Sequence, residues 1–216
     1  MKLVLFDCDG TLVDSAAIIH GTMVETFREA GLAEPALDDT KSIIGLTLNL
    51  AIARLLAREL DAEIEHMTER YKHHFQAQRL LPGFHEPLYD GIAPLLAELS
   101  ARDDVLLGMV TGKSRRGVRA VFATHGFGER FIAIRTADDC PSKPHPAMVL
   151  ECCAEAGVDP ASTIVVGDAI YDMQMARSAG ATALGVAWGY HHAEGLVAAG
   201  AHAVLSTPSD LMNHLG

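Results

Sequence analysis

The chain of 216 residues lacks an excess of positive charge. Lysine and arginine number 17 against 28 aspartates and glutamates, which gives a net charge of −11. An acidic surface of this kind repels phosphate backbones and anionic lipid, so nonspecific binding of nucleic acid or of a membrane surface is disfavoured. An anionic substrate would therefore need local positive groups or a metal ion to bind.

The chain also has little cysteine and no long apolar run. The four cysteines are Cys8, Cys140, Cys152 and Cys153. They form no CxxC pair, so neither a zinc knuckle nor a thioredoxin-type pair is expected. The apolar run near the start stops at Asp7, which is too short for a signal peptide, and the longest uncharged run, residues 178–193, is too short and too polar to span a bilayer. We expect a reduced, cytoplasmic protein with no membrane partner.

Short β-rich segments alternate with helical segments through most of the chain. Strands are expected over residues 2–6, 105–110, 131–134, 163–166, 183–187 and 203–205. Helices are expected over residues 114–124, 146–156 and 170–179, each followed by a glycine that suits a left-handed helix end. This alternation predicts an α/β fold with a Rossmann-like, doubly wound parallel sheet and right-handed crossovers.

Residues 15–81 interrupt the alternation, because this stretch shows helical patterns only. Ser15 is expected to cap a helix that runs to Gly31, and further helices are expected over residues 48–60 and 64–78. The apolar face of the first helix would contain Ile19, Met23, Phe27 and Ala30. We predict a core of residues 1–14 and 82–216 and an inserted α-helical cap domain of residues 15–81, with hinges near residues 14–15 and 81–83. The insert either decorates the fold or acts as a lid over the carboxyl edge of the sheet, where ligands of such sheets bind.

Four polar clusters follow predicted strands and should meet at one edge of a parallel sheet. They are Asp7-Cys8-Asp9-Gly10-Thr11, Thr111-Gly112-Lys113, Ser142-Lys143-Pro144, and Gly167-Asp168 with Asp172. Clustered carboxylates repel one another unless a cation is present, and three of them with one lysine suit Mg²⁺. A carboxylate beside such an ion can attack phosphorus, and a second can exchange a proton with the leaving oxygen. A hydroxyl, a backbone N–H and a lysine can offset the charge of the phosphoryl oxygens.

The segments DCDGTLVDS, VTGKS, SKPHP and GDAIYD resemble, in this order, motifs one to four of the haloacid dehalogenase-like hydrolase superfamily. The inserted segment resembles the type-one helical cap of that superfamily, so the resemblance covers nearly the whole chain. Residues 42–48 and 185–190 further resemble the cap loop and the GVxWG run of its phosphoglycolate phosphatase-like group. The resemblance implies a Rossmann-like core, a helical cap and a Mg²⁺ cofactor.

The resemblance implies roles for four of the aspartates in the motifs. Asp7 would be the nucleophile and a metal ligand. Asp9 would be the general acid and base and would give the metal its backbone carbonyl. Asp168 would complete the metal site, and Asp172 would ligate the metal or orient a water bound to it. Asp9 also argues against dehalogenation, because attack on a carbon–halogen bond needs no acid for the leaving group.

The resemblance also implies residues that bind the phosphoryl group and the substrate. Thr111 and the N–H of Gly112 would hold the phosphoryl group, Lys143 would offset its charge, and Gly45 would contact the substrate from the cap loop. Two positions depart from the usual motifs: Gly112 stands where asparagine is common, and Ala169 where threonine or serine is usual. Neither departure removes a metal ligand.

These residues predict a Mg²⁺-dependent phosphatase that hydrolyses a small phosphate monoester through an aspartyl-phosphate, with 2-phosphoglycolate as a candidate substrate. A phosphomutase, a pyrophosphatase or a phosphonate-cleaving hydrolase remains an alternative; in the last, Lys41 could form a Schiff base. A non-catalytic phospho-acceptor or phosphate-binding protein is the alternative of another class. The expected partner is a small phosphorylated metabolite, and the chain is expected to be a monomer or homodimer.

Overall fold

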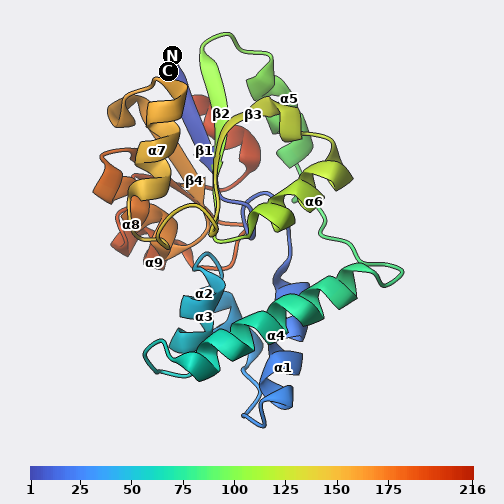
Figure 1. Ribbon diagram of the computed structural model, residues 1–216. Helices are drawn as coiled ribbons and strands as arrows, with labels where there is room; N and C mark the ends of the chain where they lie inside the picture. Colours follow the sequence, from blue (N-terminus) through green and yellow to red (C-terminus); the bar gives the residue numbers. More distant parts are fainter.

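A computed structural model describes all 216 residues and contains one six-stranded sheet in the order β3-β2-β1-β4-β5-β6, in which every pair of neighbours is parallel (Figure 1). The strands are β1 (Lys2–Phe6), β2 (Val105–Val110), β3 (Phe131–Arg135), β4 (Thr163–Gly167), β5 (Thr182–Val186) and β6 (Ala203–Leu205). The strands at the centre are buried on both faces, as their continuous apolar runs require. The predicted α/β fold with a Rossmann-like parallel sheet is confirmed.

Helices cover both faces of the sheet. One apolar core contains residues of α5 (Ile92–Ser100) and α6 (Arg115–His125), together with the 3₁₀ helix η3 (Pro208–His214). The other core contains residues of α7 (Ala147–Ala156), α8 (Ile170–Ala179) and α9 (Ala193–Ala198). Two shorter 3₁₀ helices, η1 (Gly128–Arg130) and η2 (Pro160–Ser162), lead into β3 and β4. The sheet is therefore rigidly held, and its carboxyl edge is a stable platform for a site.

Four helices lie beyond that edge of the sheet and pack around an apolar core of their own (Figure 1). They are α1 (Ala16–Glu29), α2 (Leu37–Ile43), α3 (Leu48–Leu55) and α4 (Ala62–Arg79). Their core is centred on fully buried side chains, among them Met23, Ile52, Ile64 and Met67. The four helices thus have a core separate from the two cores that flank the sheet, and the domain boundaries given above, residues 15–81 for the cap, stay a prediction.

The inserted helices differ from the sequence-based expectations in four details. Ser15 precedes α1 but makes no side-chain capping hydrogen bond, because its hydroxyl is engaged elsewhere. Ala30 is exposed rather than part of the apolar face. The helix expected over residues 48–60 ends at Leu55, and Ala57 then adopts a φ of 49°, which the helix cannot accommodate. The short helix α2 was not predicted.

The chain enters and leaves the helical module at neighbouring points. Val13 and Leu88 form an antiparallel bridge. The N–H of Tyr89 donates to the carbonyl of Leu12 at 3.0 Å, and the N–H of Asp14 donates to the carbonyl of Pro87 at 2.8 Å. The two connections are therefore tied to each other on the core side of the module.

Two further expectations concern cysteine and membranes. All four cysteines are buried and unpaired, so they pack as small apolar groups. No helix combines the length and the apolar character that crossing a membrane would need.

Candidate active site

The floor of the site is formed where three neighbouring strands end. Asp7, Thr111 and Asp168 directly follow β1, β2 and β4, and each is about 1% exposed. The backbone holds the first two firmly, since the N–H of Asp7 donates to Val166 at 2.9 Å and that of Thr111 to Arg135 at 3.0 Å. The parallel order of the strands thus brings together residues that lie more than 150 positions apart in the chain.

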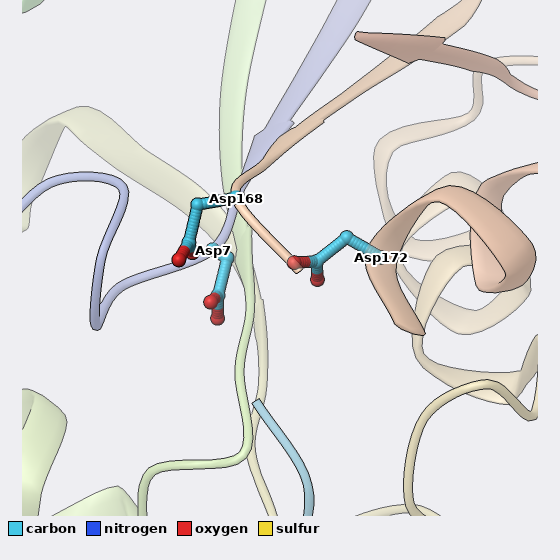
Figure 2. A group of neighbouring side chains, drawn as sticks. All are labelled: Asp7, Asp168 and Asp172. Carbon is cyan, nitrogen blue, oxygen red and sulfur yellow. The ribbon is translucent and has the colours of Figure 1, made fainter. Parts of the chain in front are cut away.

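Asp7, Asp168 and Asp172 form a buried carboxylate cluster in which one oxygen of each lies within 4.8 Å of the others (Figure 2). The oxygens of Asp168 accept hydrogen bonds from the Thr11 hydroxyl at 3.1 Å and from the N–H of Tyr190 at 2.9 Å. Oδ2 of Asp7 has no hydrogen-bond partner, and Oδ1 is paired only with the ammonium of Lys143. Buried polar atoms are nearly always paired, so the unpaired oxygen of Asp7 is available to bind a ligand.

Lys143 connects two members of the carboxylate cluster. Its Nζ lies 2.7 Å from Oδ1 of Asp7 and donates to Oδ1 of Asp172 at 2.6 Å. Oδ2 of Asp172 in turn accepts from the N–H of Ala169 at the start of α8. Burial alone would lower the pKa of Lys143, but the two carboxylates outweigh it and raise that pKa. The ammonium therefore stays charged where a phosphoryl group would need a cation.

The same burial has the opposite effect on the carboxylates. Loss of solvent raises the pKa of Asp7 to about 7, against the opposing attraction of Lys143 and with a further rise from Asp172. Burial, followed by the charges of Asp7 and Asp172, also raises the pKa of Asp168 well above its ordinary value. One positive charge is too little for three buried carboxylates, and the cluster retains an affinity for a cation.

The donor set fits Mg²⁺. Hard divalent cations take oxygen ligands, and Mg²⁺ needs only one or two carboxylates because it keeps several waters. Asp7 offers Oδ2, which has no partner, and Asp168 and Asp172 lie beside it. The Asp9 carboxylate is outside this group, so only its backbone carbonyl could serve as a ligand.

Glycine is required next to the cluster. Gly10 has a φ of +84°, and a Cβ atom there would lie 2.2 Å from Oδ2 of Asp168. On the other side of the same side chain, a Cβ atom at Gly189 would lie 2.1 Å from Cβ of Asp168. Both loops can approach Asp168 only because they carry no side chain at these points. The GVxWG run of the sequence therefore has a structural role, which Trp188 supports by donating from Nε1 to the carbonyl of Thr11 at 3.1 Å.

Asp9 belongs to a second polar group that the sequence did not reveal. Its Oδ1 accepts from the Ser15 hydroxyl at 2.6 Å and from Nζ of Lys113 at 2.6 Å. Lys113 also donates to Oε1 of Glu86 at 3.0 Å. Burial alone would lower the pKa of Lys113, but Asp9 and Glu86 outweigh it and raise that pKa. Lys113 stands in the VTGKS motif, which was a usable indication, whereas nothing in the sequence marks Glu86.

The cap loop of residues 42–47 is docked on the core. The N–H of Thr47 donates to Oγ of Ser142 at 2.9 Å, and the hydroxyl of Tyr171 donates to the carbonyl of Ser42 at 3.0 Å. A Cβ atom at Gly112 would lie 2.5 Å from the carbonyl oxygen of Leu46 and 2.7 Å from that of Gly45. The glycine at position 112 thus leaves room for this loop, and a side chain there would collide with its backbone.

The carboxylate floor opens into a cavity of about 530 Å³ between the sheet and the four cap helices. Asp7, Asp9, Thr111 and Gly112 line its floor, and Gly45 lies on the cap side. The remaining lining includes apolar and polar residues of the cap, among them Ile19, Met23, Asn49, Phe75 and Gln76. Lys143, Asp168 and Asp172 lie behind the floor. The predicted site residues are therefore collected around this cavity, Gly45 on the cap side and the others at the floor or directly behind it.

Basic residues of the cap have partners within the protein. Arg58, Arg70 and Lys72 pair with neighbouring carboxylates of the cap. Arg54 lies over the ring of Tyr171 at 5.5 Å. Lys41 is not one of the residues that line the cavity.

Comparison with known proteins agrees with this geometry. The family model described as haloacid dehalogenase-like hydrolase matches residues 4–186. A phosphoglycolate phosphatase of Agrobacterium fabrum is 34% identical over 87% of this chain and 81% of its own length. An N-acetylmuramic acid 6-phosphate phosphatase of Pseudomonas putida is 31% identical over 90% of this chain and 86% of its own.

A solved structure of a hydrolase from Pseudomonas syringae superimposes with a TM-score of 0.84 at 25% identity, covering 100% of this chain and 98% of the other. The expected resemblance to the phosphoglycolate phosphatase-like group is confirmed by these relatives. The match of the family model over most of the chain and the shared fold show that the chain belongs to the haloacid dehalogenase-like hydrolase family.

Proposed function

We propose that the chain is a Mg²⁺-dependent phosphatase that hydrolyses a phosphate monoester through an aspartyl-phosphate on Asp7. The observation that carries this proposal is the state of Asp7: a buried carboxylate at the floor of the cavity, paired with Lys143 through Oδ1 and without a partner at Oδ2. The membership of the chain in a hydrolase family and its similarity to named phosphatases support this class of reaction.

In the first half of the reaction, an oxygen of Asp7 attacks phosphorus and the bond between phosphorus and the ester oxygen breaks. Thr111 and the N–H of Gly112 bind the phosphoryl oxygens, and Lys143 offsets the charge that develops on them. Mg²⁺, held by Asp7, Asp168 and the backbone carbonyl of Asp9 with Asp172 close by, would neutralise phosphoryl charge and orient the group. The nearest fixed positive charge of the protein is Nζ of Lys143, 2.7 Å from Asp7.

Asp9 supplies the proton chemistry. It lines the cavity two residues after the nucleophile, so its carboxyl can give a proton to the leaving oxygen. In the second half, the same carboxylate takes a proton from the water that attacks the aspartyl-phosphate, which releases phosphate and restores both aspartates. One residue thus acts as acid and then as base.

The helices of the inserted module cover the cavity, and we assign them the role of a lid. The docked loop of residues 42–47 closes one side of the cavity, and Gly45 there is positioned to contact the substrate. A closed lid keeps bulk water from the reaction, and its opening would admit substrate and release product. Relatives named for phosphoglycolate and for N-acetylmuramic acid 6-phosphate set the range of substrates to test.

The test is release of phosphate from a panel that contains 2-phosphoglycolate, N-acetylmuramic acid 6-phosphate, hexose phosphates, a chromogenic aryl phosphate and pyrophosphate. Each is measured with Mg²⁺ and with a chelator, using the wild type and Asp7→Asn. Mg²⁺-dependent turnover that Asp7→Asn abolishes supports the proposal. A folded protein that turns over none of them, or that accumulates a persistent phosphoenzyme, would favour the mutase or the phospho-acceptor alternative.

A further inference from the structure

Lys113 joins two carboxylates in a buried network of charges beside the floor of the cavity. Its Nζ lies 2.6 Å from Oδ1 of Asp9 and 3.0 Å from Oε1 of Glu86. Arg79 completes the network, with Nη2 at 3.4 Å from Oε2 of Glu86. All four side chains are buried or nearly so, which makes these contacts costly to break and strongly orienting.

The network joins three separate parts of the chain. Asp9 follows β1, and Lys113 follows β2 and lies just before α6. Arg79 is the last residue of the cap helix α4, and Glu86 lies in the connection that returns from that helix to the core. His125 of α6 donates from Nε2 to the carbonyl of Glu86 at 2.8 Å, which ties this connection to the core. Glu86, which accepts the hydrogen bond from Lys113, is therefore itself fixed to the core.

The contacts on Asp9 are unequal for its two oxygens. Oδ1 accepts from both the Ser15 hydroxyl and Lys113, at 2.6 Å each. Oδ2 receives no hydrogen bond from the protein, and Asp9 lines the cavity. Two donors on one oxygen fix the plane of the carboxyl group and leave the other oxygen free to exchange a proton with the substrate.

Lys113 itself is poorly placed to act as a binding group for an anionic substrate. Its ammonium already has two carboxylate partners within 3.0 Å, so its charge is balanced within the protein. A substrate phosphate or carboxylate would have to displace one of these partners and leave it buried without a counterion, which is strongly unfavourable.

We propose that Lys113, held by Glu86, is a positioning residue that orients Asp9 for proton transfer to the leaving group. This inference rests on the proposed function, because it assigns Asp9 the acid–base role. It predicts that loss of Lys113 affects those substrates whose leaving oxygen needs a proton. For substrates whose leaving group departs as a stable anion, loss of Lys113 should change the activity little.

The experiment compares kcat/KM for two kinds of monoester, an alkyl phosphate and 2,4-dinitrophenyl phosphate. This quantity includes only the steps up to formation of the phosphoenzyme, so the later role of Asp9 as a base does not enter. For Lys113→Gln we expect kcat/KM for the alkyl phosphate to fall by at least about tenfold, as a part of the roughly 10²–10⁴ that acid catalysis supplies. The value for 2,4-dinitrophenyl phosphate should change by less than about threefold, by the same reasoning.

Three further variants keep the test decisive. Lys113→Arg retains a buried cation and should restore part of the alkyl phosphate activity. Glu86→Gln is nearly isosteric and should show the same selectivity with a smaller loss, and it decides the question if Lys113→Gln does not fold. Arg102→Gln removes an exposed cation that pairs with Asp104 away from the site, so it controls for the change in net charge.

Equal losses on both substrates, or a loss confined to KM, would overturn the inference, because Lys113 would then bind substrate or merely support the fold. Thermal denaturation of each variant shows whether the fold is intact. If the wild type itself hydrolyses neither substrate, the proposed function fails, and the role of Lys113 fails with it. If the wild type is active and the variants show no selectivity, only the role of Lys113 is refuted.

Discussion

At the scale of single residues, the site depends on a carboxylate that the protein buries with one oxygen unpaired. Oδ2 of Asp7 has no partner and Oδ1 is paired only with Lys143, although the residue is about 1% exposed. An unpaired buried polar group costs about 1–3 kcal/mol or more if it is charged, so this arrangement stabilises the complex with a ligand at the expense of the free protein. The two predictions at this scale follow from that imbalance.

Asp7→Asn should reduce turnover by several orders of magnitude, because an amide cannot form the phosphoenzyme. The same variant should melt at a higher temperature than the wild type in the absence of metal, since it removes a charge from the buried cluster. Phosphate release and thermal denaturation with a chelator measure the two effects. Near-normal turnover would refute Asp7 as the nucleophile.

Mg²⁺ should stabilise the protein more at pH 8 than at pH 5.5. The pKa of Asp7 rises from an ordinary 3.8 to about 7 in the folded protein, so the folded state binds the proton more tightly than the unfolded chain. That contribution to stability is complete below pH 3.8 and is lost as the pH rises through 7. A proton and Mg²⁺ compete for the same oxygens of Asp7. Mg²⁺ therefore stabilises the protein most at a pH at which the proton has dissociated.

The measurement is the increase in melting temperature on adding Mg²⁺ at each pH. Asp7→Asn is the control, because its response should be small and nearly independent of pH between these values. An equal increase for the wild type at both pH values would contradict the involvement of Asp7.

Sequence reasoning singled out the aspartates, Thr111 and Lys143 because each lies in a short polar motif on the carboxyl side of a strand. It could not assign the partners of Asp9. Ser15 was expected to cap a helix, and a serine at a helix start is equally compatible with capping or with a distant partner. Glu86 is 77 positions from Asp9 in an irregular connection, and only the folded chain brings the two to the same lysine.

At the scale of elements, the main feature is the contact between the cap loop and the turn after β2. The carbonyls of Gly45 and Leu46 occupy the space that a side chain at position 112 would fill. Gly112 departs from the asparagine common in the motif, and the close approach of the loop accounts for this departure. The boundaries of the strands were predictable to within one residue, whereas α2 and the end of α3 depend on packing that no local pattern reveals.

Gly112→Ala should weaken the docking of the cap loop by roughly 1–3 kcal/mol, the usual cost of inserting atoms into a filled space. We expect a higher KM and a lower kcat, with an unchanged melting temperature of the protein. Gly21→Ala in α1 is the matched control, since a Cβ atom there would meet nothing within 4 Å. Unaltered kinetics of Gly112→Ala would show that the loop does not need to dock during turnover.

At the scale of the whole molecule, the cavity between cap and sheet sets the size of the substrate. Its volume of about 530 Å³ lies within the range of roughly 300–1,000 Å³ typical of sites for drug-sized ligands. A two-carbon body such as glycolate would leave the apolar cap residues Ile19, Met23 and Phe75 without contact. The helical content of residues 15–81 was foreseeable from their uninterrupted helical pattern, but the size of the enclosed space was not.

Larger phosphomonoesters should therefore be better substrates than 2-phosphoglycolate. About 60 Å² of additional apolar contact is worth about 1.5 kcal/mol, or roughly tenfold in kcat/KM. Comparison of 2-phosphoglycolate with hexose 6-phosphates and N-acetylmuramic acid 6-phosphate tests this expectation. Phe75→Ala should reduce the advantage of the larger compounds and leave the smaller one unaffected, and a preference of the wild type for 2-phosphoglycolate would contradict it.

The antiparallel bridge between Val13 and Leu88 has a consequence for how this protein can change over evolutionary time. Because the chain leaves and rejoins the core at adjacent points, the intervening segment is an insertion whose two ends lie side by side. A different insert with closely spaced ends could be exchanged there at little entropic cost and without disturbing the strands. New specificities could thus arise by recombination at this junction while the reaction chemistry is inherited intact.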